Sequence, residues 1–216
     1  GHLLRQAGRR VCVGGNIGTA ILSLDDLSDD MAYVIELSSY QIDLTPTLKP
    51  TVGVLLNVTP DHIDRHGTFE NYAAVKARMV IEADTGVVAI DDPVTRGISD
   101  RAARAGRRVV HVSGVADPGA TLRASGTELV LSEARGERVV ADLADIASLR
   151  GTHNAQNAVA AVAAVQALGV PVEQAVAGLA SFPGLAHRME EVARRGDVVF
   201  VNDSKATNAD AAARSL

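Results

Sequence analysis

The segment TVGVLLNVTPDHIDRHGTFENYAAVKARMV (residues 51–80) joins three elements in a row. The apolar, β-branched run from Thr51 to Val58 predicts a buried strand. A loop rich in Asp, His and Arg follows it. The apolar spacing over Phe69–Ala83 then predicts an amphipathic helix. A strand that leads through a loop into a helix is half of a βαβ unit, so we expect an α/β fold with a mostly parallel sheet flanked by helices.

The rest of the chain first continues this alternation of strands and helices and then includes a run of short strands. Further strands are predicted at Val11–Val13, Tyr33–Ile35, Val87–Ile90 and Arg108–Val112. Further helices are predicted at Pro93–Ala105, His153–Leu168 and Val172–Ser181. Between them, residues 120–143 hold three short strands broken by Ser-Gly and Arg-Gly turns, which predict a small antiparallel patch. The segment SFPGLAHR is typical of a linker, and a hairpin around Arg195-Gly196 follows it. We therefore predict one domain over residues 1–183 and the beginning of a second over 184–216.

Composition excludes several classes of protein. The 216 residues are 47% hydrophobic and 22% charged, as in ordinary globular domains, and the net charge of −5 gives no basic footprint for nucleic acid. The single cysteine, Cys12, fits a reducing compartment. No apolar run reaches the roughly twenty residues that span a bilayer, and no signal peptide is recognisable. We expect a cytoplasmic protein without nucleic-acid partners or membrane insertion.

Both ends of the sequence read as interrupted helices. GHLLRQAG is typical of the last turns of a helix that stops at Gly8, and NADAAARSL is typical of a helix just begun. We therefore expect the chain to be a piece of a longer protein.

The segment VCVGGNIG resembles a dinucleotide-binding fingerprint, with Glu36 near the expected spacing for a ribose contact. Val13 stands where the first glycine of that fingerprint belongs, however. The following TAILSLDDLSDD is also short for a crossover helix. A plain tight turn explains the glycines equally well.

Two polar clusters follow predicted strands, at the edge where open α/β sheets bind ligands. YVIELSSYQ presents Glu36, whose carboxylate suits Mg²⁺, and Ser38, which alternatively caps a helix. NVTPDHIDRHG presents His62, a possible metal ligand that Asp61 could orient. The neighbouring Asp64, Arg65 and His66 could equally form ordinary loop ion pairs. The spacing does not fit zinc.

Lys76 lies on the inward stripe of the helix predicted over Phe69–Ala83. That stripe comprises positions 69, 72, 73, 76, 79, 80 and 83. A lysine there is costly to bury unless its charge is compensated. The ordinary explanation is a packed stem whose ammonium reaches water. The alternative is an amine that faces a phosphate and metal site and is chemically modified.

Two further segments carry candidate ligand contacts. GTHNAQNA starts a helix with Asn154 and Asn157, whose amides could cap the helix or read the edge of a purine. VFVNDSKATN leads from a strand into Asp203, Lys205 and Thr207, where the second predicted domain begins.

Taken together, GGNIG, ELSSYQ, NVTPDHIDRHG with the lysine of YAAVKARM, GTHNAQNA, GLAHRME and NDSKATN resemble, in this order, the Mur ligase family. GGNIG and NDSKATN are similar to the member that adds D-glutamate. Ala186 departs from the family's usual proline. The resemblance covers nearly the whole chain and implies a P-loop-type central ATPase domain whose phosphate loop precedes residue 1, followed by the start of a Rossmann-like domain. It also implies that the isolated chain is inactive.

The resemblance implies a monomeric ligase that uses ATP and Mg²⁺ to join D-glutamate to UDP-N-acetylmuramoyl-L-alanine through an acyl phosphate. The implied roles are as follows: Glu36, His62 and a carbamylated Lys76 hold Mg²⁺; Asn16 and Ser38 contact the muramoyl substrate; Asn154, Asn157, Arg188 and Asp203 hold the nucleotide; Lys205 and Thr207 face the reacting centre and D-glutamate.

Three alternatives remain at this point. A sibling Mur ligase or a folylpolyglutamate synthase would share the DH-containing loop but should lack NDSKATN. A dinucleotide-dependent oxidoreductase would use GGNIG and Glu36 but would leave His62 and Lys76 idle. A non-catalytic role of the isolated chain is the third.

Overall fold

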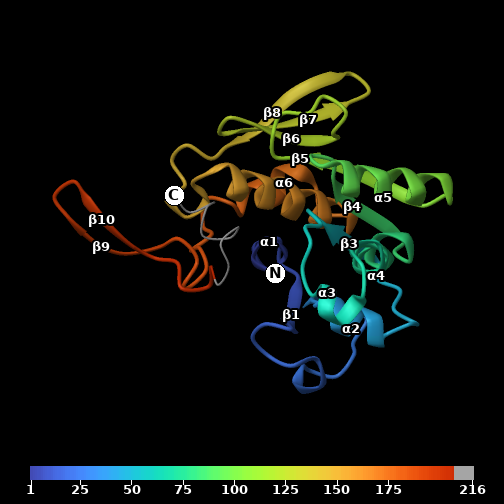
Figure 1. Ribbon diagram of the computed structural model, residues 1–216. Coiled ribbons are helices and arrows are strands. Elements are labelled where there is room, and N and C mark those ends of the chain that lie inside the picture. Colours follow the sequence, from blue (N-terminus) through green and yellow to red (C-terminus); the bar gives the residue numbers. More distant parts are fainter. Residues whose placement is uncertain (207–216) are drawn as a thin grey trace.

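The computed structural model describes residues 1–206 and begins with a small parallel unit (Figure 1). Helix α1 (His2–Gln6) precedes strands β1 (Arg10–Gly15) and β2 (Met31–Glu36), which pair in parallel as a two-stranded sheet. Only the short 3-10 turn η1 (Ile21–Ser23) lies in the connection between them. The expectation that this segment is too short for a crossover helix is confirmed.

The main sheet has six strands in the order β3-β4-β5-β6-β7-β8. The bounds are β3 (Val52–Leu55), β4 (Thr85–Ala89), β5 (Arg108–Ser113), β6 (Leu122–Ser125), β7 (Glu128–Glu133) and β8 (Gly136–Asp142). The first four strands run parallel, and β7 and β8 add antiparallel pairs. The predicted antiparallel patch therefore exists, and it extends the parallel sheet instead of standing apart from it.

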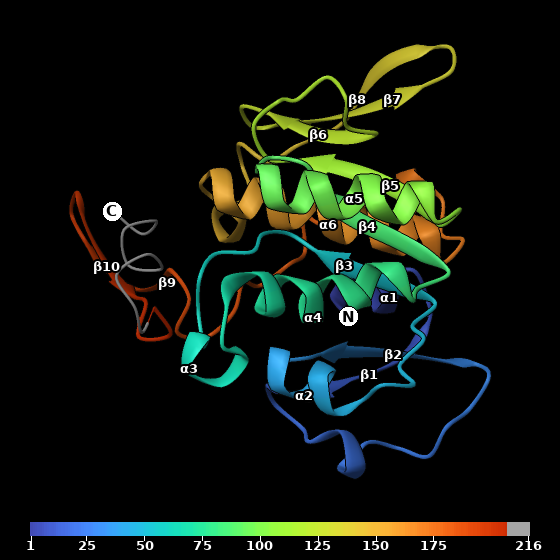
Figure 2. The same ribbon diagram turned by 45° about the vertical axis from the view of Figure 1, so that its right-hand side comes forward.

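Helices cover both faces of this sheet (Figure 2). One face packs against α4 (Phe69–Ile81) and α5 (Pro93–Arg104), and the other against α6 (Thr152–Ala167), which α7 (Val172–Ala177) and α1 join. Every residue of β4, the strand next to the edge strand β3, is buried, as expected for a parallel strand with helices on both sides. The sheet is thus a rigid platform for the loops at its edges.

The local structure differs from the sequence expectation at several boundaries. Helix α3 (Ile63–His66) forms where a polar loop was predicted, and helix α2 (Ser39–Leu44) begins after Ser38, the residue offered as a possible helix cap. Strand β3 ends at Leu55, three residues before the predicted end, because its pairing with β4 ends there. Helices α4 and α7 also end earlier than predicted, at Ile81 and Ala177.

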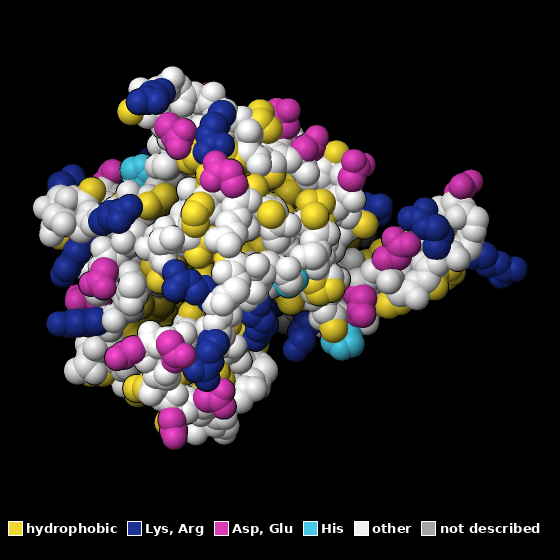
Figure 3. Space-filling view, turned by 180° about the vertical axis from the view of Figure 1, so that it is seen from behind, with side chains coloured by type: hydrophobic (Ala, Val, Ile, Leu, Met, Phe, Trp, Pro, Cys, Tyr) yellow, Lys and Arg dark blue, Asp and Glu magenta, His cyan; other side chains and the backbone are white. Residues whose placement is uncertain are grey.

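The hairpin predicted around Gly196 is confirmed. Strands β9 (Glu190–Arg195) and β10 (Val198–Asn202) pair antiparallel, and Gly196 adopts a φ of 60° at the turn. The hairpin projects from the body of the molecule, with acidic and basic side chains along it (Figure 3). The domain boundary after residue 183 stays a prediction. The expected helix NADAAARSL and Thr207 lie outside the described residues, and no helix within residues 1–206 could cross a membrane.

Candidate metal and nucleotide site

The glycine turn after β1 lies directly beside the end of β2. The Asn16 amide donates to the Glu36 carbonyl at 2.8 Å. Gly15 has a φ of 121°, and a Cβ there would lie 2.1 Å from the same carbonyl oxygen, so this close approach requires glycine. The backbones of Asn16 and Glu36 therefore lie side by side where β1 and β2 end. The contact of Asn16 with a muramoyl substrate stays a prediction. The connection to β2 contains no helix whose N-terminus could hold a pyrophosphate, which argues against the dinucleotide-binding alternative.

Ser38 is the N-cap of α2. Its hydroxyl accepts from the Gln41 amide at 3.3 Å, and the Ser38 amide donates to Gln41 Oε1 at 2.9 Å, which completes a capping box. The capping alternative is thus confirmed. A contact between Ser38 and a muramoyl substrate stays a prediction.

His62 adopts an unusual backbone conformation at the start of α3. Its φ of 51° and ψ of 34° are left-handed, a region that non-glycine residues rarely occupy and that recurs at functional sites. Asp61 Oδ1 accepts from the His62 amide at 2.9 Å, and Asp61 Oδ2 lies 3.6 Å from His62 Nε2. The imidazole remains about half exposed and lies 5.1 Å, centroid to centroid, from the Tyr40 ring. Asp61 and Tyr40 thus orient a histidine that an incoming ligand can still reach.

The Lys76 amine faces the same region from α4. Burial lowers the pKa of Lys76, while the nearby carboxylates of Asp61 and Glu36 oppose that shift. Its Nζ lies 5.3 Å from the centre of the Tyr72 ring, one helical turn earlier. Burial and Asp61 also raise the pKa of Tyr72. Lys76 is partly buried on the inward stripe of α4, and its amine lies near two carboxylates. A chemical modification of this amine stays a prediction.

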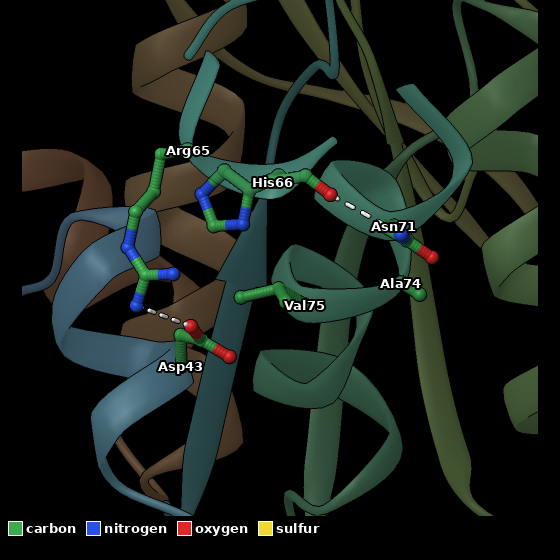
Figure 4. A pocket seen from close by; sticks show the side chains of 6 residues that line it. All are labelled: Asp43, Arg65, His66, Asn71, Ala74 and Val75. Atoms are coloured by element: carbon green, nitrogen blue, oxygen red, sulfur yellow. Dashed lines mark hydrogen bonds and ion pairs between the residues drawn. The ribbon is translucent and has the colours of Figure 1, made fainter. Parts of the chain in front are cut away.

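Beside this group, α2, α3 and α4 line an open depression of about 350 Å³ (Figure 4). Its lining residues are Asp43, Arg65, His66, Asn71, Ala74 and Val75. Arg65 forms an ion pair with Asp43 at 2.9 Å, so the ion-pair alternative holds for this arginine. The ion-pair alternative does not apply to His66, whose Nε2 lies 3.0 Å from the buried hydroxyl of Ser39.

A second group lies at the start of α6. The Asn154 amide side chain donates to the Arg150 carbonyl at 2.8 Å, and Asn157 Nδ2 lies 3.5 Å from Asn154 Oδ1. Arg150 also pairs with Glu191 at 3.8 Å, so the base of the hairpin lies next to this helix start. The two asparagines share one helix face, and their role toward a nucleotide stays a prediction.

The hairpin base gathers the remaining described candidates. Asp203 Oδ1 accepts from the Met189 amide at 3.1 Å, directly after the exposed Arg188. The Lys205 amide donates to the His187 carbonyl at 3.1 Å. The structure therefore brings Arg188, Asp203 and Lys205 together.

Three residues of this region did not emerge from the sequence. Tyr40 follows the predicted Ser38 cluster, and Tyr72 was assigned only to the apolar stripe. Asp91, at the end of β4, accepts from Gln156 Nε2 at 2.7 Å and so fixes the start of α6. Its position just past a buried strand was a usable signal.

The donor set fits Mg²⁺ better than zinc. Within residues 1–206, no three His, Cys, Asp or Glu side chains converge closely enough to enclose a metal by themselves. Mg²⁺ is usually held by one or two protein carboxylates together with waters and substrate phosphates, so a carboxylate such as that of Glu36 suits it without a closed set of protein ligands. Zinc would need a closed tetrahedral set.

Curated proteins are similar to this chain over its whole length. The profile of the Mur ligase middle domain matches residues 4–165. The chain is 53% identical over 215 residues to the UDP-N-acetylmuramoylalanine--D-glutamate ligase of Rhizobium meliloti and 55% identical over 215 residues to that of Rhizobium etli. Each alignment covers all of this chain and 46% of the relative. The chain therefore spans about half the length of the curated relatives it matches.

Solved structures show the same fold at low sequence identity. MurF from Acinetobacter baumannii superposes with a TM-score of 0.69 at 20% identity, covering 99% of this chain and 55% of that one. The MurF ligase from Thermotoga maritima in complex with ADP also gives 0.69, at 19% identity, covering 99% and 52%. The sequence profile, the curated relatives and the fold agree, and the chain belongs to the Mur ligase family, of which it carries the middle domain.

Proposed function

We propose that the complete protein carrying this chain is an ATP- and Mg²⁺-dependent ligase of peptidoglycan synthesis that joins D-glutamate to UDP-N-acetylmuramoyl-L-alanine. The observation that carries this proposal is the 53% identity, over the entire chain, to relatives named for that reaction. The electrostatic effect of the Glu36 and Asp61 carboxylates on the Lys76 amine supports it, because a phosphoryl-transfer site needs metal and substrate contacts in one place. We place the reaction in the cytoplasm and the working enzyme as a monomer.

Glu36, His62 and Lys76 are the residues that would hold Mg²⁺. When bound, Mg²⁺ would neutralise the charge that develops between the substrate carboxylate and the γ-phosphate of ATP. The Asp61 carboxylate holds the backbone of His62 through the contact at 2.9 Å and lies 3.6 Å from its Nε2. Asn16 and Ser38 would contact the muramoyl substrate beside Glu36.

Lys76 would serve as a carbamate. The ammonium first loses one proton. The neutral amine then attacks carbon dioxide, a nitrogen–carbon bond forms as one C=O π bond opens onto oxygen, and a second proton is released, so a cationic side chain becomes an anionic one. The lowered pKa of the amine favours the neutral form that this step requires. The two carbamate oxygens are of the kind that Mg²⁺ prefers, whereas an ammonium at this position would repel the metal.

The second group of residues would hold the nucleotide. Asn154 and Asn157 would face the base, and Arg188 and Asp203 the remainder of the nucleotide, with Asp203 on the ribose. Lys205 and Thr207 would face the reacting centre and the incoming D-glutamate. The proximity of Arg150 to Glu191 supports this division, because it keeps the hairpin base next to the start of α6.

The test is substrate dependence of the complete protein. ADP and phosphate should form only when UDP-N-acetylmuramoyl-L-alanine, D-glutamate, ATP and Mg²⁺ are all present. Turnover with meso-diaminopimelate or L-lysine and none with D-glutamate would assign the chain to a sibling ligase. Turnover with a folate substrate would assign it to folylpolyglutamate synthesis.

A further inference from the structure

His66 occupies the centre of a chain of aromatic contacts that the proposed function does not use. Its ring centre lies 5.8 Å from that of Tyr40 and 5.4 Å from that of Tyr72. Tyr40 in turn contacts the His62 ring at 5.1 Å, and the Lys76 amine lies 5.3 Å above the Tyr72 ring. An unbroken series of ring contacts therefore runs from His62 to Lys76 through His66.

The His66 ring is itself held on several sides. The residue is 9% exposed, and its Nε2 lies 3.0 Å from the hydroxyl of Ser39, which is also buried. Its carbonyl accepts from Asn71 Nδ2 at 3.1 Å, in the first turn of α4 (Figure 4). Since Ser39 belongs to α2, His66 to α3 and Asn71 to α4, this one residue joins three helices.

We propose that His66 is a positioning residue that fixes His62 relative to Lys76, acting through Tyr40 on one side and Tyr72 on the other. The proposal rests on the proposed function, in which His62 and Lys76 hold the same metal site. Mg²⁺ requires nearly ideal octahedral geometry, so small shifts between two protein ligands weaken its binding. Edge-to-face and tilted ring pairs have preferred geometries, so the placement of one ring restricts the placement of the ring that packs against it on the next element.

The chain offers a matched control for this histidine. His111 on β5 lies 2.7 Å, through its Nε2, from the hydroxyl of the buried Ser99 on α5. It repeats the histidine–serine contact of His66 without membership of the ring series. Replacement of either histidine by glutamine keeps an amide that can hydrogen bond to the serine and removes the ring. Only His66→Gln breaks the series between His62 and Lys76.

The experiment uses the complete protein without nucleotide or muramoyl substrate and two readouts. Mn²⁺ serves as the metal probe, and its affinity is measured by electron paramagnetic resonance. We expect His66→Gln to weaken Mn²⁺ binding about tenfold, the lower end of the loss seen when residues that orient metal ligands are replaced. His111→Gln should leave Mn²⁺ binding unchanged. In the metal-free protein, the His62 Hε1 resonance, assigned with His62→Ala, should shift in His66→Gln and stay in place in His111→Gln.

A second pair of variants covers the case in which His66→Gln does not fold. Tyr40→Leu removes a ring from the series and should weaken Mn²⁺ binding and shift the His62 resonance, whereas Tyr40→Phe keeps the ring and should restore both. If His62→Ala and Lys76→Ala weaken Mn²⁺ binding but His66→Gln behaves like His111→Gln, the positioning role is refuted and the metal site stands. If His62→Ala and Lys76→Ala leave Mn²⁺ binding unchanged, the metal site itself is refuted, and the positioning role with it.

Discussion

Replacement of Gly53 by alanine should displace the helix that carries Lys76. Gly53 lies buried in β3, and a Cβ at this position would be 1.6 Å from the Met79 carbonyl oxygen and 3.2 Å from the Ala83 Cβ. The first neighbour is backbone and cannot rotate away. Restoring an ordinary contact of 3.4 Å requires α4 to move by the difference, about 1.8 Å, since a close-packed interior has no spare volume.

Two consequences follow from that movement. Overpacking of a core costs about 3 kcal/mol at the upper end of its usual range. At about 2–4 °C per kcal/mol for a domain of this size, the melting temperature should fall by about 6–12 °C. Lys76 moves with Met79 on the same helix, and a misplacement of about 1 Å can cost on the order of 100-fold in turnover.

The assay measures the melting temperature and ligase turnover of the complete protein, with Gly97→Ala as the matched control. Gly97 lies inside α5, and a Cβ there meets nothing within 4 Å. Its replacement should raise the melting temperature by about 2–4 °C, because alanine favours a helix over glycine by about 1 kcal/mol. Wild-type stability and turnover in Gly53→Ala would refute the close packing of β3 against α4.

The other predictions concern Lys76 and one helix cap. Lys76→Ala should lose most turnover, and added short-chain carboxylates should restore part of it. Lys76→Arg should resist that rescue because the arginine keeps a positive charge. Near-normal turnover in Lys76→Ala would favour the alternative in which the ammonium reaches solvent. Because burial lowers the pKa of Lys76 below its ordinary 10.5, the unfolded chain binds more protons between the two pKa values, so this residue's contribution to stability rises with pH there. Because the lowered pKa raises the neutral fraction of the amine as the pH increases toward it, the carbamate signal of Lys76, read by ¹³C NMR under labelled carbon dioxide, should increase with pH below the ordinary value of 10.5, and a flat profile would contradict the neutral-amine step. Asp92→Ala removes the cap that accepts from the Val94 and Thr95 amides, each at 2.9 Å, and should cost about 1 kcal/mol, seen as a melting temperature about 2–4 °C lower with unchanged turnover.

Local pattern in the sequence determined the elements and the edge at which polar residues gather. The apolar run of β4 and the periodicity of α4 and α5 each follow from the residues within one element, so these elements were predicted nearly to their ends. Glu36 and His62 could each be placed just past the carboxyl end of a predicted strand. The sequence did not show that these two strands, β2 and β3, belong to separate sheets. The inward position of Lys76 followed from the helical period alone.

Only the tertiary structure decided how the residues around His62 and Lys76 are held together. Ser39 and His66 stand 27 positions apart, and they meet because α2 and α3 both pack against α4. The left-handed backbone of His62 and the ring series through Tyr40 and Tyr72 likewise depend on packing between elements. The sequence encodes such contacts only through the volumes and shapes that fit once the elements have assembled, and no periodicity within a single element records them.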